Sequence, residues 1–171
     1  MKRRRTLIYA LPLLVMVFIF IQPALPDILS GRESGLVVSF LLKFVEADPD
    51  KLSFIVRKCS HFLEFLLLGA TLVPSVRQWR SGRLERSSGR LHGGRLESAP
   101  EAGNRRGSFI GAGMSWLIGT VYAMTDEFHQ IFVAGRSCEL RDVMIDSAGV
   151  LCGVLIIASV HRLRSAVPAR S

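Results

Sequence analysis

Residues 107–130 read GSFIGAGMSWLIGTVYAMTDEFHQ, and this stretch decides the fold. Its first part, Gly107–Thr125, carries no charged side chain. About 20 helical residues cross roughly 30 Å of hydrocarbon, so this part is long enough to span a bilayer. The last part, Asp126-Glu127-Phe128-His129-Gln130, is rich in ionisable groups. A charged side chain costs about 2.5–3.5 kcal/mol at the centre of a membrane helix, so an ionisable cluster at the end of a span indicates a polar site.

Three further apolar segments have about the length of a membrane span: Thr6–Pro26, Cys59–Val76 and Val143–Val160. We therefore expect an all-α integral membrane four-helix bundle. The first segment follows a basic start, as a cleaved signal peptide would. Its apolar run is long, however, and it lacks an Ala-x-Ala cleavage site, so residues 1–28 are predicted to be an N-terminal transmembrane helix.

The positive charges lie between the apolar segments. A formal net charge of +8 is compatible with nucleic-acid binding, but a mean hydropathy of +0.34 and the lack of a basic stripe with interleaved aromatic residues argue against that class. Lys and Arg gather at residues 2–5, at 77–106 and after Val160, whereas segments 27–58 and 126–142 hold at least as many acids as cations. Because cytoplasmic loops are rich in Lys and Arg, the predicted topology is N-in and C-in.

Two connecting segments have their own patterns. Between the first two predicted spans, apolar residues recur at helical spacing over a stretch that is too short to cross a bilayer. This pattern predicts a short amphipathic surface helix. The apolar residues are Leu36, Val37, Phe40, Leu41, Phe44 and Val45. Asp48 before Pro49 is typical of an N-cap and first helical position. Residues 77–107 repeat Gly-Arg-Leu three times among Ser, Glu and Pro, so we expect a disordered loop there.

Three of the expected helices each carry a polar stripe near the extracytoplasmic side. Lys58, His61 and Glu64 step by three residues and share one helical face. Asp126 and His129 continue a stripe on the third span, and Asp142 and Asp146 form one on the fourth. The predicted pocket consists of Lys58, His61, Glu64, Asp126, Glu127, His129, Gln130, Arg136, Asp142 and Asp146.

Small residues accompany these stripes and predict close helix packing. Gly111, Ser115, Gly119 and Ala123 repeat every four residues on the third span, and Gly149 and Gly153 follow Asp146 on the fourth. Such patterns let membrane helices approach closely.

Acids outnumber cations in the predicted pocket. Buried carboxylates must be paired, protonated or bound to a cation. Arg136 could bridge several of them, some could stay neutral, or a cationic ligand could complete the set. These alternatives stay open at this point.

Several motifs occur in order between Leu52 and Gly153: Lys58-x-x-His61-Phe62-x-Glu64-Phe65, Asp126-Glu127-x-His129-Gln130-x-Phe132, Gly135-Arg136 and Asp142-x-x-x-Asp146-x-x-Gly149. Together they resemble the VanZ-like family, membrane proteins whose namesake is linked to resistance to the glycopeptide antibiotic teicoplanin. The resemblance implies a VanZ-like domain at 29–153, then a helix end and basic tail at 154–171, in the cytoplasmic membrane of a bacterium. The chain departs from the family pattern at Phe65, where Tyr is usual, and at Asp146, where Asn is common.

Three interpretations of the cluster remain: a structural network, a ligand pocket and a hydrolytic metal site. No His-Glu-x-x-His or comparable spacing is present, so neither a metal nor a cofactor is predicted. We expect a non-enzymatic envelope protein whose pocket binds a lipid, a cell-wall precursor or a lipophilic glycopeptide antibiotic. The alternative is a membrane hydrolase or transferase acting on outer-leaflet lipid-linked substrates, with His61 or His129 as acid/base and Arg136 holding a phosphate or carboxylate.

The expected partners are the lipid bilayer and such a ligand, and nucleic acid is not among them. Four helices are few for a transporter unless the chain forms a homo-oligomer, which the sequence permits.

Overall fold

The computed structural model describes residues 2–22, 38–44, 48–88, 101–133 and 138–166. This part of the chain contains helices and turns and no strand, so the all-α prediction is confirmed for it. Residues 38–41 form a short helical stretch that ends in a turn at 42–44. The four long helices are α1 (Lys2–Ile21), α3 (Pro49–Ser88), α4 (Glu101–Gln130) and α5 (Leu140–Ala166).

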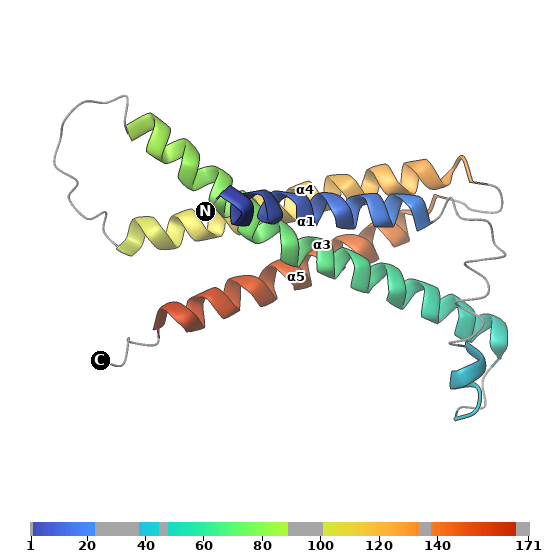
Figure 1. The fold of residues 1–171 in the computed structure, drawn as a ribbon. Coiled ribbons are helices and arrows are strands. Elements are labelled where there is room, and N and C mark those ends of the chain that lie inside the picture. The colour runs from blue at the N-terminus through green and yellow to red at the C-terminus, as the bar shows by residue number, and fades with distance from the viewer. Residues whose placement is uncertain (1, 23–37, 45–47, 89–100, 134–137, 167–171) are drawn as a thin grey trace.

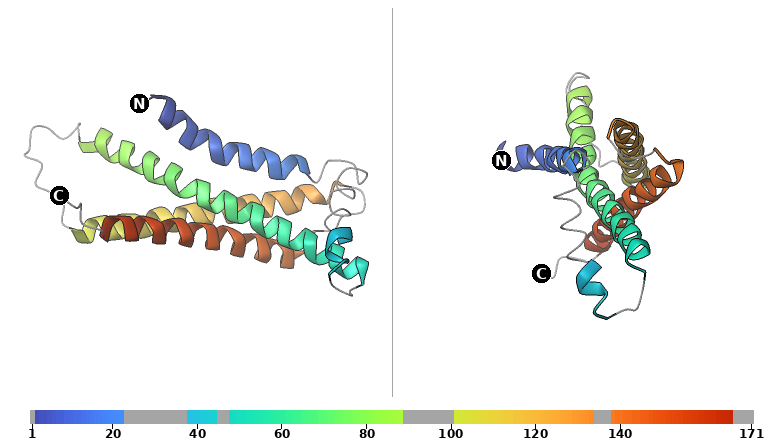
Figure 2. Two further views of the ribbon diagram at one scale, coloured as in Figure 1. Left: turned by 60° about the horizontal axis from the view of Figure 1, so that its bottom comes forward. Right: turned by 90° about the vertical axis from the view of Figure 1, so that its right-hand side faces the viewer.

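The four long helices lie lengthwise beside one another (Figures 1 and 2). The start of α1, the end of α3, the start of α4 and the end of α5 share one end of the bundle. The contact between α3 and α5 is the most extensive, α4 packs against both, and α1 lies mainly against α3. The central side chains are Val15, Ile19, Phe65, Leu68, Leu72, Val73, Ala123, Val150 and Val154.

Glycines set the spacing of the helices around α5, as the small-residue pattern predicts. A β-carbon on Gly153 would overlap the backbone carbonyl oxygen of Leu66, and one on Gly149 would lie 2.5 Å from the carbonyl oxygen of Phe62. On α4, a β-carbon on Gly119 would lie 2.5 Å from Cγ1 of Val150. The backbones of α3 and α5 are therefore closer than any larger side chain at these positions would allow.

The predicted start of α3 is confirmed. The Asp48 Oδ1 atom accepts a hydrogen bond from the backbone N–H of Asp50 at 3.0 Å, and the Asp48 carbonyl accepts one from the N–H of Leu52 at 3.0 Å. These bonds satisfy N–H groups that a helix start otherwise leaves unpaired, while Pro49 has no N–H to satisfy.

The disorder predicted for residues 77–107 is wrong for both ends of that segment. Helix α3 continues to Ser88 and α4 already begins at Glu101, while residues 89–100 lie outside the described part. Arg, Leu and Glu are good helix formers, so a helix that already exists extends through them despite the polar composition. Contacts with α4 support the extension, because Arg77 Nη2 donates to Ser108 Oγ at 2.5 Å and Arg80 Nη1 donates to the Gly107 carbonyl.

The predicted surface helix is seen only in its middle. Residues 38–41 are helical, and the rings of Phe40 and Phe44 pack with their centroids 5.2 Å apart. Leu36, Val37 and Val45, which also carried the prediction, lie outside the described residues.

Within the described part of the chain, two helices are long and apolar enough to cross a membrane: α3 over Pro49–Arg83 and α5 over Leu140–Arg164. The apolar part of α1 that the structure describes, Thr6–Ile21, is shorter. Among the described residues α4 does not reach the same hydropathy, because glycines, serines and threonines interrupt its apolar run. Membrane character is thus supported, and the prediction of four spans is supported directly for two helices.

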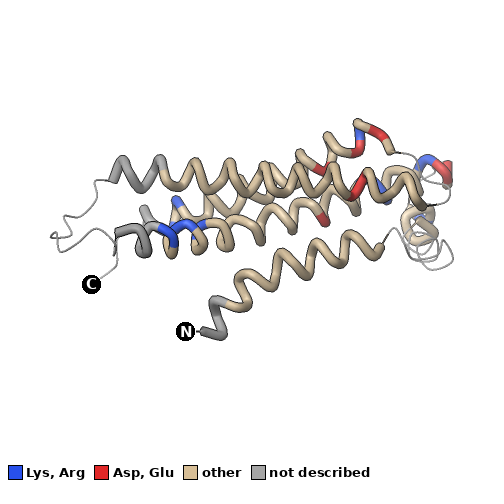
Figure 3. Tube along the Cα trace, turned by 90° about the horizontal axis from the view of Figure 1, so that it is seen from above, with Lys and Arg blue, Asp and Glu red and all other residues tan. Residues whose placement is uncertain are grey.

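Charge is distributed unevenly along the bundle (Figure 3). At one end lie arginines of α3 and α5. Arg77, Arg80 and Arg162 belong to this end, because they contact Ser108, Gly107 and Phe109 near the start of α4. The acids of the described side chains gather at the opposite end, together with a few cations. The residues between the two ends are almost all uncharged, as a membrane-spanning bundle requires.

Candidate functional site

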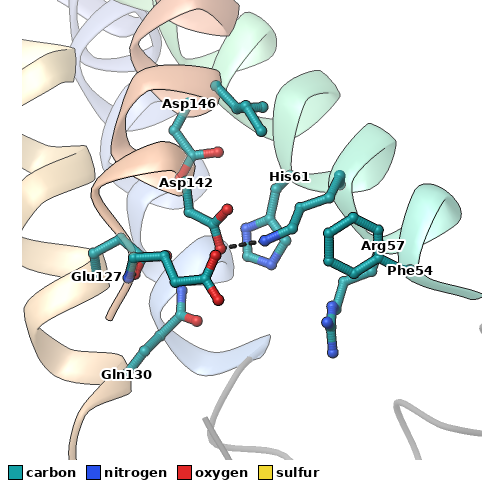
Figure 4. A pocket seen from close by; sticks show the side chains of 10 residues that line it. Phe54, Arg57, His61, Glu127, Gln130, Asp142 and Asp146 are labelled. Atoms are coloured by element: carbon teal, nitrogen blue, oxygen red, sulfur yellow. Dashed lines mark hydrogen bonds and ion pairs between the residues drawn. The ribbon is translucent and has the colours of Figure 1, made fainter. Parts of the chain in front are cut away.

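A polar pocket lies at the acidic end of the bundle, between α3, α4 and α5 (Figure 4). Its volume is about 90 Å³, enough for a few water molecules or a small polar group. The residues that line it are Phe54, Arg57, Lys58, His61, Glu127, Gln130, Glu139, Asp142, Ile145 and Asp146. Six of the ten residues predicted to form the site therefore share this pocket.

An ion pair links α3 to α5 across the pocket. Lys58 Nζ donates to Asp142 Oδ2, and the two side chains are only 17% and 16% exposed. Lys58 precedes His61 by one helical turn, so both side chains reach the pocket from the same face of α3. The second carboxylate oxygen of Asp142 is buried and has no hydrogen-bond partner in the described part of the chain.

Asp146 forms the inner wall of the pocket. It follows Asp142 by four residues on α5 and so lies about 6 Å deeper along the helix. The residue is 2% exposed, and its Oδ2 atom has no hydrogen-bond partner among the described residues. A buried carboxylate without a donor is costly, which marks this end of the pocket as a place for a proton or a cation.

Glu127 joins the end of α4 to the start of α5. Its Oε2 atom accepts a hydrogen bond from the backbone N–H of Glu139 at 3.1 Å, just before Leu140 begins α5. Glu127 lies beyond the apolar segment of α4. Burial raises the pKa of its carboxyl above the usual value, while the hydrogen bond from Glu139 opposes that rise. The residue therefore has a structural function as well as a place in the pocket.

Asp126, next to Glu127, is 1% exposed. Gln130 Nε2 donates to Asp126 Oδ2 at 3.0 Å, one turn later on the same helix. Gln130 also lines the pocket, so it connects the buried Asp126 to the pocket wall.

Cations surround the ring of Phe54 at the outer side of the pocket. The guanidinium carbon of Arg57 lies 5.8 Å from the ring centroid, Lys58 Nζ lies 5.1 Å from it, and the guanidinium carbon of Arg141 lies 5.6 Å from it. Arg141 Nη2 also donates to Glu139 Oε2 at 3.0 Å. We call Arg57, Lys58 and Arg141 the basic rim.

The predicted pocket left out four residues that line it: Phe54, Arg57, Glu139 and Ile145. Phe54, Arg57 and His61 follow steps of three and four residues on α3, so extending the stripe of Lys58 outward would have found them. Glu139 has no such pattern, because it comes before the first residue of α5.

Two predicted site residues lie toward α1 instead. The ring of His129 stacks on that of Phe20, with centroids 4.1 Å apart. Glu64 is hydrogen-bonded by the side chain of Gln22, which follows α1. Neither residue lines the pocket. Arg136, the predicted charge anchor, lies outside the described residues, as does Gly135.

The described residues contain no group of three His, Cys, Asp or Glu side chains arranged to hold a metal ion. His61 is the imidazole among the described residues that line the pocket, and Figure 4 shows it on α3, across from Glu127 and Asp142. The arrangement can hold a small charged group between acids and cations, and His61 could exchange a proton with it.

Comparison with known proteins agrees with the motifs. The family described as VanZ/LLP1 matches residues 6–161, which include every residue that lines the pocket. Neither the curated proteins nor the solved structures give a significant match. The match covers most of the chain and includes the segments whose motifs suggested the family, and the chain therefore belongs to the VanZ/LLP1 family.

Proposed function

We propose that this chain is a multi-pass protein of the bacterial cytoplasmic membrane whose extracytoplasmic pocket binds the polar headgroup of an envelope lipid or lipid-linked cell-wall precursor. In this proposal α1, α3, α4 and α5 all cross the bilayer, with both termini inside. The arginines at the ends of α3 and α5 support that orientation, since cations favour the cytoplasmic side.

The observation that carries the proposal is the buried Asp146 carboxylate facing a polar cavity between otherwise apolar helices. Intramembrane ionisable residues are costly and usually serve function. Outward-facing side chains of the same helices are large and apolar, as lipid contact requires; examples are Leu63, Leu67, Leu117, Val121 and Leu155. A lipid at this surface could place its chains along the helices and its headgroup in the pocket.

The size of the pocket favours a headgroup over a whole antibiotic. Pockets for drug-sized ligands measure about 300–1,000 Å³, whereas this one measures about 90 Å³. A glycopeptide is larger still than an ordinary drug molecule. An effect on such an antibiotic would then follow from the lipid or precursor that the protein binds.

His61 supports a second candidate function, a membrane enzyme acting on lipid-linked substrates. Its imidazole lines the pocket beside the Lys58–Asp142 ion pair, where it could act as general acid or base. Turnover of a lipid-linked phosphate by the purified protein, abolished by His61→Gln, would establish this alternative.

Retention of lipid by the purified protein tests the proposed function. Ile145 lines the pocket, so Ile145→Phe should fill it without changing charge. Met144 is adjacent on α5 but 68% exposed, so Met144→Phe is the matched control. We expect native mass spectrometry to show bound lipid in the wild type and in Met144→Phe, and loss of most of it in Ile145→Phe. Equal retention by both variants, or no bound lipid in the wild type, would overturn the proposal.

A further inference from the structure

We propose that the pocket recognises a zwitterionic headgroup, with a primary ammonium at its inner acidic end and a phosphate at the basic rim. The chemical class is a phosphate joined to an amine by a short alkyl chain, as in phosphoethanolamine. This inference rests on the proposed function and specifies the ligand of the same site.

The inner end of the pocket calls for a cation. Four acids line the pocket against two cations: Glu127, Glu139, Asp142 and Asp146 against Arg57 and Lys58. Asp146 is 2% exposed, and its Oδ2 atom has no partner in the described part of the chain. Asp142 lies one helical turn farther out, and its buried Oδ1 atom likewise has no hydrogen-bond partner among the described residues. An ammonium between these carboxylates would compensate charges that Lys58 alone does not neutralise.

The outer side of the pocket is suited to an anion. Arg57 and Arg141 are exposed at the basic rim, and the planar guanidinium fork binds phosphate in a bidentate manner. Figure 4 shows Arg57 and Asp146 at opposite sides of the pocket, with the Lys58–Asp142 ion pair between them. The two charges of a zwitterion would thus meet opposite charges at the two ends.

Size and hydrogen bonding select a primary amine. An ammonium has three N–H donors for the acceptors on Asp142 and Asp146, whereas a trimethylammonium has none and is bulkier. The pocket volume of about 90 Å³ leaves little room for three additional methyl groups. A glycerol headgroup would fit the rim through its phosphate but would leave the Asp146 carboxylate without a cation.

The test measures binding of defined lipids to the full-length protein in nanodiscs that contain phosphatidylethanolamine, phosphatidylcholine or phosphatidylglycerol. We expect the wild type to prefer phosphatidylethanolamine over each of the others by about tenfold, the effect of one charge-assisted contact. Asp146→Asn should remove that preference, whereas Asp50→Asn, an exposed acid at the start of α3, should keep it. Thermal melting of each variant shows whether it is folded. If Asp146→Asn does not fold, the comparison of the three lipids on the wild type still tests the preference for phosphatidylethanolamine.

The basic rim has a separate variant. Arg57→Gln should weaken phosphatidylethanolamine and phosphatidylglycerol about equally, because both contain the phosphate, while Lys51→Gln at the same end of α3 should weaken neither. Free O-phosphoethanolamine serves as a competitor in the same assay. Displacement of the lipid at similar concentration would identify a soluble zwitterion as the source, and failure to displace it would identify the membrane lipid.

The outcomes separate this inference from the proposed function. Suppose that the three lipids bind equally and that Ile145→Phe loses all three. This result would overturn the proposed recognition of an ammonium and a phosphate, but it would still support a pocket that binds lipid headgroups. A preference for phosphatidylethanolamine that survives in a folded Asp146→Asn would also overturn the inference. Absence of any lipid binding would overturn both.

Discussion

The Lys58–Asp142 ion pair is the most direct link between two helices in the pocket. Both side chains are largely shielded from water, and each belongs to a stripe that the sequence already indicated. Sequence spacing placed Lys58, His61, Asp142 and Asp146 on suitable helix faces. It could not tell which lysine meets which carboxylate, because that depends on the axial offset of α3 against α5.

Lys58→Met should destabilise the protein by about 1–3 kcal/mol, because it leaves the Asp142 carboxylate without its cation. The partial exposure of the pair keeps the cost below that of a fully buried one. A second change, Asp142→Asn, should recover part of the loss. The measurement is thermal melting of the two single variants and the double variant in the same detergent. Additive losses in the double variant would contradict direct pairing.

Tyr122→Phe should loosen α1. The Tyr122 hydroxyl donates to the Met16 carbonyl at 2.5 Å, which ties α4 to α1. Loss of one such bond costs about 1 kcal/mol. We expect faster proteolysis or hydrogen exchange in α1, with little change in α5. Uniform destabilisation of all helices would show that α1 unfolds together with the rest.

At the scale of the helices, close packing of α3 against α5 depends on glycine. Gly153→Ala should be clearly destabilising, by about 1–3 kcal/mol, because its β-carbon meets the backbone of α3 and the helices must separate. Gly113→Ala on α4 is the matched control, since a β-carbon there has nothing within 4 Å. Thermal melting of both variants gives the comparison. Equal melting temperatures of the two variants would contradict the close approach of α3 and α5 at Gly153.

Helix periodicity predicted which faces pack, but helix ends followed other rules. Asp48 and Pro49 marked the start of α3 correctly because capping is a local property of the chain. The end of α3 at Ser88 and the start of α4 at Glu101 were not evident. There, low-complexity composition argued for disorder, while contacts such as that between Arg77 and Ser108 are visible only in three dimensions.

For the whole molecule, orientation in the membrane is the prediction that matters most for the pocket. Cys138 is exposed just before α5, at the pocket end, while Arg83 is exposed near the other end of the bundle. In variants whose only cysteine is Cys138 or Arg83→Cys, a membrane-impermeant maleimide should label Cys138 in intact cells. It should label Arg83→Cys only after permeabilisation. Labelling of both in intact cells would refute the proposed topology.

The order in which the chain is made has a consequence for α1. Its hydrogen-bonded partners come much later in the sequence: Ser75 Oγ donates to the Ile8 carbonyl across 67 residues, and Tyr122 Oη bonds to Met16 across 106 residues. During synthesis α1 leaves the ribosome before either partner exists. Helix α1 therefore exists for a time without these two partners, and the tightly packed α3–α5 pair can form only after most of the chain has been translated. The pocket between α3, α4 and α5 therefore forms late in synthesis. Helix α1 is made first, but it can pack against α3 and α4 only after both have been made.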